Sequence, residues 1–442
     1  MPQLLSRSVA GGGSLVSLVS VALMASAALP VNSASAATIH VMNCNDSGVG
    51  SLRGSVASAL SGDTIDLTKL RCNRIVLTSG QISITQLDLT LIGPGRSRLT
   101  LDGNHASRVF LATGNLVIKS MSIANGHSQG MGREDDPAGG CIFSNRDVEL
   151  NGINLHDCLA EPDLQSGLPL GGGVWAGSHL RLINSNVFSN VARKGSGGGA
   201  GSNNLVVYRS HIYNNSATGF HGGGLAGGDI SLSYSTVNNN TSQREGGGIH
   251  SYRLIVNKST VNNNRALAAV TGQGGGAWSV EMHVYDSTFS SNVGYAGSAI
   301  VARDFAQISN STIAFNQETH ADSPESFGAV RSDKYSINSS IIARNRSNAA
   351  FGNDIGPGAS YVRGANNLIE KSAIPLPADT ISANPLLAPL ANNGGPTKTH
   401  ALLNGSPAID HGNNFRHRLY DQRGPGFVRV KGAAADIGAF EL

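Results

Sequence analysis

Apolar residues recur along this chain with a period of two that is interrupted by one longer step. Seven segments share the order apolar, any, apolar, two of any, Ser, any, apolar, two of any, Asn. They begin at Leu180, Leu205, Ile230, Leu254, Met282, Ala306 and Tyr335 and end at Asn190, Asn215, Asn240, Asn264, Asn292, Asn316 and Asn345. A repeat of 24 to 29 residues is one supersecondary unit that cannot bury its apolar face alone, so the copies must stack into a solenoid.

The spacing inside each unit predicts strands rather than helices. Period two is strand periodicity, and the three-residue step marks a bend between two short strands. Runs of glycine precede most units, and they permit positive φ and a close approach of neighbouring coils; they lie at 171–173, 197–199, 222–224, 246–248 and 274–276. Coils of about three strands that pair in parallel about 4.8 Å apart form a parallel β-helix. The predicted fold class is all-β, a right-handed parallel β-helix.

The repeated Asn and Ser are expected to form columns along the stack. Stacked Asn side chains hydrogen-bond from coil to coil and to the turn backbone, and Asn tolerates the left-handed conformation at a bend. A row of ligand-binding Asn is the alternative interpretation. We interpret the stacked Ser and the aliphatic columns as core packing.

Residues 1–36 have the pattern of a secretory signal peptide. Arg7 gives a positive start, an apolar run follows over 15–29, and small residues at 34–36 offer a cleavage site. No other run reaches the ~18 apolar residues that a membrane span needs. The sequence therefore predicts an exported protein, secreted or periplasmic, or loosely associated with the cell surface.

Residues 37–70 are predicted to form an N-terminal cap. Leu52, Val56, Ala59 and Leu60 would lie on one face of a short amphipathic helix that covers the apolar first coil. Such a cap is needed because a parallel stack otherwise ends in an unpaired edge. The β-helix itself is then expected over 71–383.

Residues 384–442 are rich in turn dipeptides with scattered apolar anchors. We predict an irregular C-terminal cap that folds over the far end of the solenoid. The apolar anchors expected to cover that end are Leu386, Leu387, Leu390, Leu402, Leu403, Ile409 and Ile437. Asp421 and Arg423 are expected to pin the irregular chain by hydrogen bonds rather than to act in catalysis.

Motifs at both ends and in the repeats carry a family resemblance. The Gly-Ser-Leu-Arg of 50–53 with the Gly-Asp-Thr-Ile of 62–65 resembles the CSLREA-type N-terminal domain of secreted bacterial β-helix proteins. The glycine runs and the Phe-x-x-Asn of 289–292 resemble polymorphic outer-membrane protein repeats, and 384–441 resembles the choice-of-anchor Q domain. The resemblance implies a right-handed β-helix on an exported protein and supplies no activity. The chain departs from the N-terminal signature at 54–56.

The four cysteines suggest disulfides, because their number is even and the chain is predicted to be exported. Cys44 and Cys72 are 28 residues apart, about one coil. Cys158 occupies the place of a ladder Asn and Cys141 the place of a third Gly, and these two columns should meet at one corner. We therefore predict Cys44–Cys72 and Cys141–Cys158, with the two other connectivities as alternatives.

One column of charges along the predicted stack is a candidate catalytic site. Counting seven residues on from successive coil starts gives Asp229, Arg253, Glu281 and Arg303, with Asp304 next to it. Alternating signs favour a surface salt-bridge ladder, in which each link contributes at most ~1 kcal/mol. The alternative is catalysis on a polysaccharide, with two carboxylates cleaving a glycosidic bond or holding Ca²⁺ beside an arginine base. These five residues are called the charge column below.

Loops between each Asn and the next glycine run vary most in length, and binding residues of solenoids usually lie in such loops. Their charged and histidine residues are Glu161, Asp163, Arg193, Lys194, His221, Arg244, Glu245, Glu318, His320 and Asp322. The 13 histidines show no metal-ligand spacing, so neither a metal nor a cofactor is predicted. The net charge of +3, without a basic stripe, argues against nucleic acid.

The sequence thus predicts a monomeric, exported structural or adhesive protein. Its expected partner is a glycan or a cell-surface protein, bound along an edge of the solenoid. The alternative function is a polysaccharide lyase or glycoside hydrolase that uses acids on adjacent coils.

Overall fold

The computed structural model describes residues 35–129, 138–162, 170–319, 327–347 and 353–442. Residues 36–442 form one compact unit. The predicted signal peptide falls almost wholly outside the described residues. Of the charged and histidine residues in the variable loops, Asp163, His320 and Asp322 also lie outside them.

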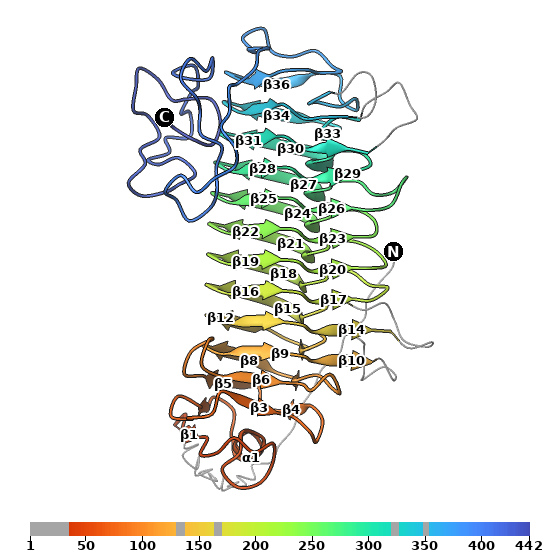
Figure 1. The fold of residues 1–442 in the computed structure, drawn as a ribbon, viewed down its shortest axis with the longest axis vertical. Coiled ribbons are helices and arrows are strands. Elements are labelled where there is room, and N and C mark those ends of the chain that lie inside the picture. Colours follow the sequence, from red (N-terminus) through yellow and green to blue (C-terminus); the bar gives the residue numbers. More distant parts are fainter. Residues whose placement is uncertain (1–34, 130–137, 163–169, 320–326, 348–352) are drawn as a thin grey trace, which may run out of the picture. The chain divides into compact units, whose positions relative to one another are not determined.

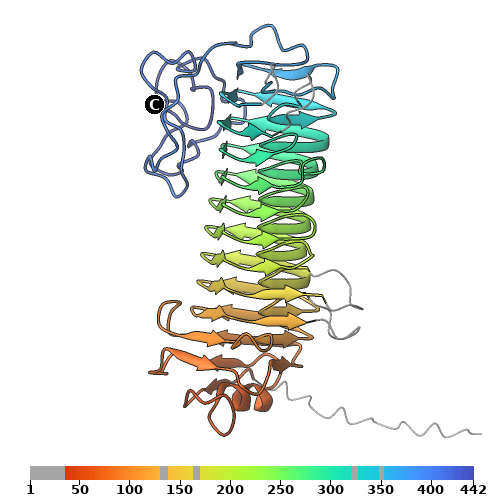
Figure 2. The ribbon, with the colours of Figure 1, turned by 45° about the vertical axis from the view of Figure 1, so that its right-hand side comes forward.

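The unit is a right-handed parallel β-helix, as the repeats predict, in which three sheets run along a common axis (Figures 1 and 2). Sheet A has 17 strands among the described residues. They are β1 (Thr38–His40), β2 (Thr64–Asp66), β4 (Ile82–Ile84), β5 (Asp88–Ile92), β7 (Phe110–Ala112), β8 (Asn115–Lys119), β11 (Ile142–Ser144), β12 (Val148–Asn151), β15 (Val174–Ile183), β18 (Ala200–Tyr208), β21 (Leu225–Ser233), β24 (Ile249–Asn257), β27 (Ala277–Tyr285), β30 (Ile300–Ser309), β33 (Val330–Ser332), β34 (Tyr335–Asn338) and β36 (Val362–Ala365).

Sheets B and C complete each coil. The described strands of sheet B are β3 (Arg74–Val76), β6 (Thr100–Asp102), β9 (Ser122–Ala124), β13 (Asn154–His156), β16 (Asn186–Phe188), β19 (His211–Tyr213), β22 (Thr236–Asn238), β25 (Thr260–Asn262), β28 (Thr288–Ser290), β31 (Thr312–Ala314), β35 (Ile341–Ala343) and β37 (Leu368–Ile369). Those of sheet C are β10 (His127–Gln129), β14 (Leu159–Glu161), β17 (Val191–Ala192), β20 (Ser216–Ala217), β23 (Thr241–Ser242), β26 (Arg265–Ala266), β29 (Val293–Gly294) and β32 (Gln317–Glu318).

The register confirms the sequence repeat. Leu205 pairs with Ile230, which pairs with Leu254, and all three are buried. The Ser column is also buried: Ser210 N donates to Ser235 Oγ at 3.0 Å, and the same bond recurs from coil to coil. Like positions therefore stack on like positions, which gives one continuous apolar core.

The Asn column forms the predicted ladder. Asn215 N and Nδ2 both donate to Asn240 Oδ1 at 3.0 Å, and Asn240 Nδ2 donates to Asn264 Oδ1 at 3.0 Å. The left-handed residue at this bend is the one before the ladder Asn, as at Asn239 with φ 54°. The ladder Asn thus satisfies buried backbone groups, and its neighbour supplies the turn.

The glycine runs lie where backbones touch. Gly222 has φ 67°, and a Cβ on Gly223 would lie 2.3 Å from Gly247 O in the next coil. Any larger side chain at Gly223 would force the coils apart, because the obstructing atom belongs to the backbone.

The N-terminal cap contains α1 (Leu52–Ser58). Ser51 caps the N-terminus of this helix, because its side chain accepts a hydrogen bond from Gly54 N. Leu52, Val56 and Ala59 are buried as expected. Leu60 is 62% exposed, so its predicted place on the buried face is wrong. The helix ends at Ser58, and the extended backbone at Ala59 turns the next side chain outwards.

Both predicted disulfides are present, joining Cys44 to Cys72 and Cys141 to Cys158. Cys158 N donates to Asn190 Oδ1 at 3.1 Å, which places Cys158 at the head of the Asn ladder. The stacking argument that chose this connectivity is therefore sound.

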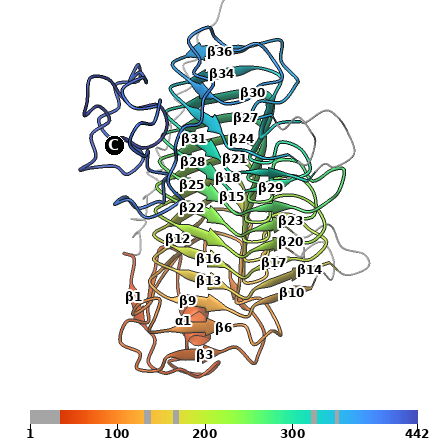
Figure 3. The ribbon, with the colours of Figure 1, turned by 45° about the horizontal axis from the view of Figure 1, so that its top comes forward.

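The C-terminal tail, residues 384–442, is irregular as predicted but does not cover the end of the solenoid. It lies along the outer face of sheet B, beside β22, β25, β28 and β31 (Figures 1 and 3). Thr288 Oγ1 donates to Gln422 Oε1 at 2.6 Å, and Ala439 N donates to Thr312 Oγ1 at 3.1 Å. The expected plug over the far end is therefore wrong.

The far end is closed instead by the segment that follows β37. Ile374 and Leu376 pack against the core of the last coil, and Val362 N donates to Pro375 O at 3.1 Å. The tail's own apolar residues form a second cluster with Ile341 and Leu368 on the outside of sheet B. Of the seven predicted anchors, Leu402 and Ile437 are buried there, whereas Leu403 is exposed.

Candidate functional site

The charge column does not form a cleft. Asp229, Arg253 and Glu281 are in register on β21, β24 and β27, and Arg253 Nη2 donates to Asp229 Oδ2. The Asp229 and Arg253 side chains are 41% and 49% exposed. The hydrogen bond from Arg253 to Asp229 raises the pKa of the arginine. This geometry fits a solvated ladder of alternating signs.

The upper end of the charge column is out of register. Glu281 pairs with Phe305, because a bulge between Ala302 and Phe305 inserts one extra residue into β30. Arg303 and Asp304 therefore pair with each other at 3.0 Å on the exposed strand. The expected alignment of Arg303 with Glu281 is wrong.

A groove is present elsewhere on the molecule, on the side of sheet B. A groove of about 840 Å³ lies between the outer face of sheet B and the C-terminal tail. Its floor comes from four successive coils, through Asn186 of β16, His211 of β19, Asn238 of β22 (with Thr236) and Asn262 of β25. Its wall comes from tail residues 392, 394–398, 423 and 425. This groove is the candidate functional site, and it is called the tail groove below.

Buried polar contacts fix the wall of the tail groove. Gln422 Nε2 donates to Thr260 Oγ1 at 3.0 Å and to Thr397 Oγ1 at 2.9 Å, which ties two tail segments to β25. Arg423 donates to Asp421 Oδ2 from Nε at 2.9 Å and from Nη2 at 2.6 Å. The expectation that Asp421 and Arg423 hold the irregular chain is confirmed.

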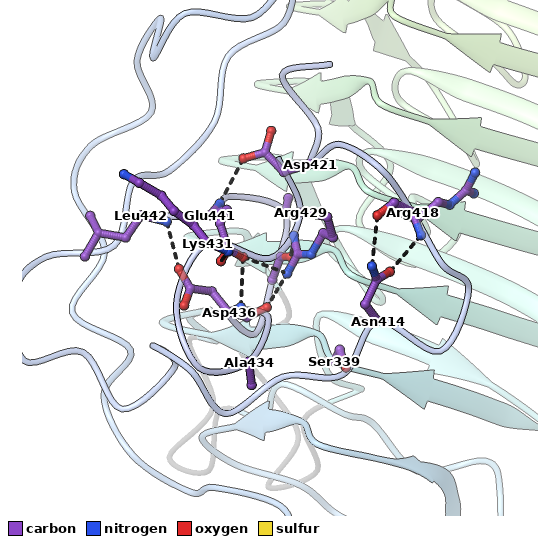
Figure 4. A network of polar contacts seen from close by, with 12 residues as sticks. Ser339, Asn414, Arg418, Asp421, Arg429, Lys431, Ala434, Asp436, Glu441 and Leu442 are labelled. Carbon is purple, nitrogen blue, oxygen red and sulfur yellow. Dashed lines mark hydrogen bonds and ion pairs between the residues drawn. The ribbon is translucent and has the colours of Figure 1, made fainter. Parts of the chain in front are cut away.

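Behind this wall, the irregular tail is held together by hydrogen bonds and ion pairs of charged groups rather than by helices or strands (Figure 4). Glu441 N donates to Asp421 Oδ2 and Asp436 N donates to Glu441 Oε2, both at 2.9 Å. Arg429 is fully buried, donates to Gly438 O at 3.0 Å and lies 3.8 Å from the Glu441 carboxylate. Because these groups are buried and mutually bonded, the tail is a fixed wall rather than a loose strap.

The tail groove is positively charged. Arg96, Arg209, Lys398 and Arg423 line it, and the described residues that line it include no aspartate or glutamate. Arg423 is neutralised by Asp421, whereas the other three form no ion pair with a described carboxylate. Arg96 is held by donating to Asn184 O at 2.9 Å, and Arg209 lies 5.4 Å from the ring centre of Tyr208.

His211 is the titratable group in the floor. Its Nε2 lies 2.5 Å from Asn238 Oδ1, an acceptor, so Nε2 carries the proton and Nδ1 is the free acceptor in the neutral ring. Burial, together with the nearby Lys398, lowers the pKa of His211. His211 is therefore neutral near pH 7.

An aromatic column leads into the tail groove. His156, Phe188 and Tyr213 occupy one outward position on consecutive coils, and the same position continues as Asn238 and Asn262. Their rings stack, with centres 4.7 and 4.9 Å apart and planes within 8° of parallel. All three are partly exposed, and because their stacked faces cover one another, they present their ring edges beside the cationic groove.

Sequence reasoning missed this site for two reasons. The aromatic column was visible as a recurring outward position two residues before each ladder residue, but outward positions were assigned to solvent. Lys398 could not be placed, because it reaches the groove only through contacts such as Thr260 Oγ1 to Lys398 O, 138 residues apart.

Comparisons with known proteins add little to this geometry. No protein-family model matches the chain, and no curated protein matches it. The resemblances to the choice-of-anchor Q, CSLREA and polymorphic outer-membrane families therefore gain no support. Among solved structures the chain is similar to pectate lyase Pel9A, with 14% identity over 92% of this chain and 97% of that one, at a TM-score of 0.40.

Two features bear on the compartment. Both disulfides fit an oxidising environment. None of the helices in the described part of the chain has the length and apolar character required to span a membrane.

Proposed function

We propose that this protein binds an acidic polysaccharide in the tail groove. The observation that carries the proposal is the convergence of Arg96, Arg209 and Lys398, without carboxylate partners, on a groove whose described lining has no acid. Guanidinium groups bind carboxylates through paired hydrogen bonds, so uronate groups are suitable ligands.

The remaining lining suits sugar hydroxyls. Asn186, Thr236 and Asn238 offer donors and acceptors in the floor. Phe188 and Tyr213 continue the site outwards with the apolar edges of their stacked rings, which offer contact to the CH groups of a sugar ring. Because four consecutive coils form the floor, the groove runs about 14 Å along the axis, which suits a short stretch of an extended chain.

Export supports this choice of ligand over nucleic acid. We infer that residues 1–36 are removed on export, since they have the pattern of a signal peptide and the chain forms two disulfides. The N-terminal residue of the protein recovered outside the cytoplasm tests this inference. A native N-terminus that retains residues 1–36 would contradict it.

Calorimetric titration with oligogalacturonate and with its carboxyl-reduced, neutral analogue tests the binding. The variant Arg96→Gln/Arg209→Gln/Lys398→Gln should lose about tenfold in affinity or more per residue, because hydrogen bonds to charged groups contribute about 1.5–3 kcal/mol each. Arg253→Gln is the matched control, since it removes one exposed cation from another face.

Three results would reject the proposal: equal binding of the neutral analogue, unchanged binding by the triple variant, or tighter binding of single-stranded DNA. Affinity for the uronate should also fall with added salt, because the groove charges are exposed to solvent.

A β-eliminating lyase is the second candidate function. His211 is favoured as the base, because its neutral Nδ1 lies in the same groove as the cations that would neutralise the uronate carboxylate. His211 would take the proton beside the carboxylate, the electron pair would form the ring double bond, the glycosidic C–O bond would break, and the leaving oxygen would take up a proton from water.

Absorbance of the unsaturated product tests this second function. Activity in the wild type that vanishes in His211→Gln, with binding retained, would make the protein a lyase; no absorbance would leave it a binding protein. A glycoside hydrolase in the tail groove is disfavoured, since its described lining lacks the required carboxylate pair. Glu281→Ala in the same assay tests the charge column.

A further inference from the structure

Three side chains with metal-binding chemistry meet at the corner where sheet C passes into sheet A. His221 and Glu245 occupy the same position on consecutive coils, each directly before a glycine run. His250 follows in β24, beside them. One Nδ1 or Nε2 atom of each histidine and one carboxylate oxygen of Glu245 lie within 4.8 Å of one another.

The geometry of this cluster is more than ring stacking. His250 stacks on Trp278 with ring centres 4.7 Å apart and planes 6° from parallel, and His221 stacks on His250 at 4.5 Å. Stacking uses the ring faces only. The His221 ring also meets Glu245 at its edge, where Nδ1 faces Oε2.

The contact between His221 and Glu245 brings a nitrogen ligand and an oxygen ligand together. His221 Nδ1 is buried and lies against Glu245 Oε2. No described lysine or arginine forms an ion pair with Glu245. The neighbouring Arg244 turns away and lies 4.8 Å from the ring centre of Phe220. The carboxylate is thus left facing imidazole nitrogens without a cation of the protein's own.

We propose that His221, Glu245 and His250 bind a divalent transition-metal ion of the zinc type. Two imidazole nitrogens and one carboxylate oxygen are a ligand set that Zn²⁺ accepts at about 2.0–2.2 Å, in a tetrahedral arrangement with the fourth position open. Ligand atoms in such a site lie about 3.4 Å apart, so on binding the contacting His221 and Glu245 atoms move apart and make room for the ion between them.

Parts of the site are already held in position, so binding of a metal ion requires little loss of conformational freedom. Trp278 holds the His250 ring in place, and the stacked coils hold the three backbones in register. The His221 and Glu245 side chains are 27% and 24% exposed, so an ion reaches them from solvent and the fourth position faces water. The site is separate from the tail groove and does not depend on the function proposed there.

The spacing of the histidines along the sequence predicted no metal site, because metal-ligand motifs place their ligands within one segment of the chain. In a solenoid the ligands come from consecutive coils, here 24 residues apart for His221 and Glu245. A histidine and an acid at equivalent repeat positions are the signal that would have found them.

Calorimetric titration of the tag-free protein with Zn²⁺, and the visible spectrum of the protein loaded with Co²⁺, test the proposal. We expect one Zn²⁺ per chain, a rise in melting temperature on binding, and a tetrahedral Co²⁺ spectrum. His250→Phe, which keeps the stack on Trp278, and Glu245→Gln, which keeps the shape, should each weaken binding at least tenfold. His179→Phe is the control, because it alters an exposed histidine paired with a single acid, Asp147.

The outcomes separate cleanly. Loss of Zn²⁺ binding in either site variant, with retention in His179→Phe, supports the site. Absence of saturable Zn²⁺ binding to the wild type, equal binding by all variants, or loss in the control alone would each overturn it. Far-UV circular dichroism identifies a variant that fails to fold, and in that case the other variant decides.

Discussion

Replacing Asn240 by Leu should break the ladder at its centre. Asn240 is fully buried and uses its amide in both directions. Its Oδ1 accepts from Asn215 N and Nδ2 at 3.0 Å, and its Nδ2 donates to Asn264 Oδ1 and to Ile212 O at 3.0 Å. Leu keeps the approximate volume and removes all four bonds.

The cost follows from which groups are left without partners. The buried backbone N–H of Asn215 loses its acceptor, Asn240 Oδ1, which costs about 1–3 kcal/mol. Asn215 Nδ2 keeps Val187 O and Asn264 Oδ1 keeps the backbone N–H of residue 240, so each loses one bond worth about 0.5–1.5 kcal/mol. The larger apolar area of Leu offsets roughly 1 kcal/mol of this. We expect a net loss of about 2–4 kcal/mol.

Urea denaturation measures the change, and hydrogen–deuterium exchange shows where it acts. Protection should fall first in the coils that contain β19, β22 and β25, since each coil contacts only its neighbours. Asn204→Leu is the control, because Asn204 is exposed on β18 and should change stability by less than about 0.5 kcal/mol.

Asn240→Asp refines the test. A carboxylate still accepts from Asn215, but it faces Asn264 Oδ1 where a donor stood. Relative to the wild type, the variant should therefore be less stable at pH 7 than at pH 4, where the protonated acid donates again. An Asn240→Leu protein as stable as the wild type, or an Asn240→Asp protein with the same pH dependence as the wild type, would refute the ladder as a source of stability.

Other predictions address the ends of the solenoid. Burial raises the pKa of Asp354 to about 7, so the folded protein holds a proton that the unfolded chain releases. Relative to the Asp354→Asn variant, the stability of the wild type should therefore fall by up to about 4 kcal/mol between pH 4 and pH 7 in thermal melts. Stability-against-pH curves that run parallel for the two proteins would contradict this. Cys141→Ala/Cys158→Ala opens a 17-residue loop and should cost about 3 kcal/mol in urea, a figure that an unchanged midpoint would refute. Deleting 384–442 uncovers Ile341 and Leu368 on sheet B and should cause self-association in light scattering; a monomeric, equally heat-stable remainder would show that this face needs no cover.

The coil architecture could be predicted because a given position of the repeat has the same surroundings in every coil. Ser235 and Asn240 meet their counterparts on either side, so one sequence position reports the burial of a whole column. The disulfide at Cys158 followed from the same logic, since it takes a ladder position. Local periodicity thus determined the core of this fold.

The tail and the tail groove could not be predicted in this way. The tail has no period, and its docking rests on single contacts between distant residues, such as Ser290 Oγ to His400 Nε2 at 2.9 Å. The bulge at Arg303 broke the charge column by one residue, which no count along the sequence reveals. The residues proposed to bind the ligand are at outward positions, and the pattern of buried positions says nothing about those.

A crystal structure of the protein with an oligogalacturonate tests the central claim most directly. The account predicts sugar density in the tail groove, with uronate carboxylates against Arg209 and Lys398 and a ring against Phe188 or Tyr213. Density on the exposed face of sheet A along Asp229, Arg253 and Glu281, with an empty tail groove, would contradict it.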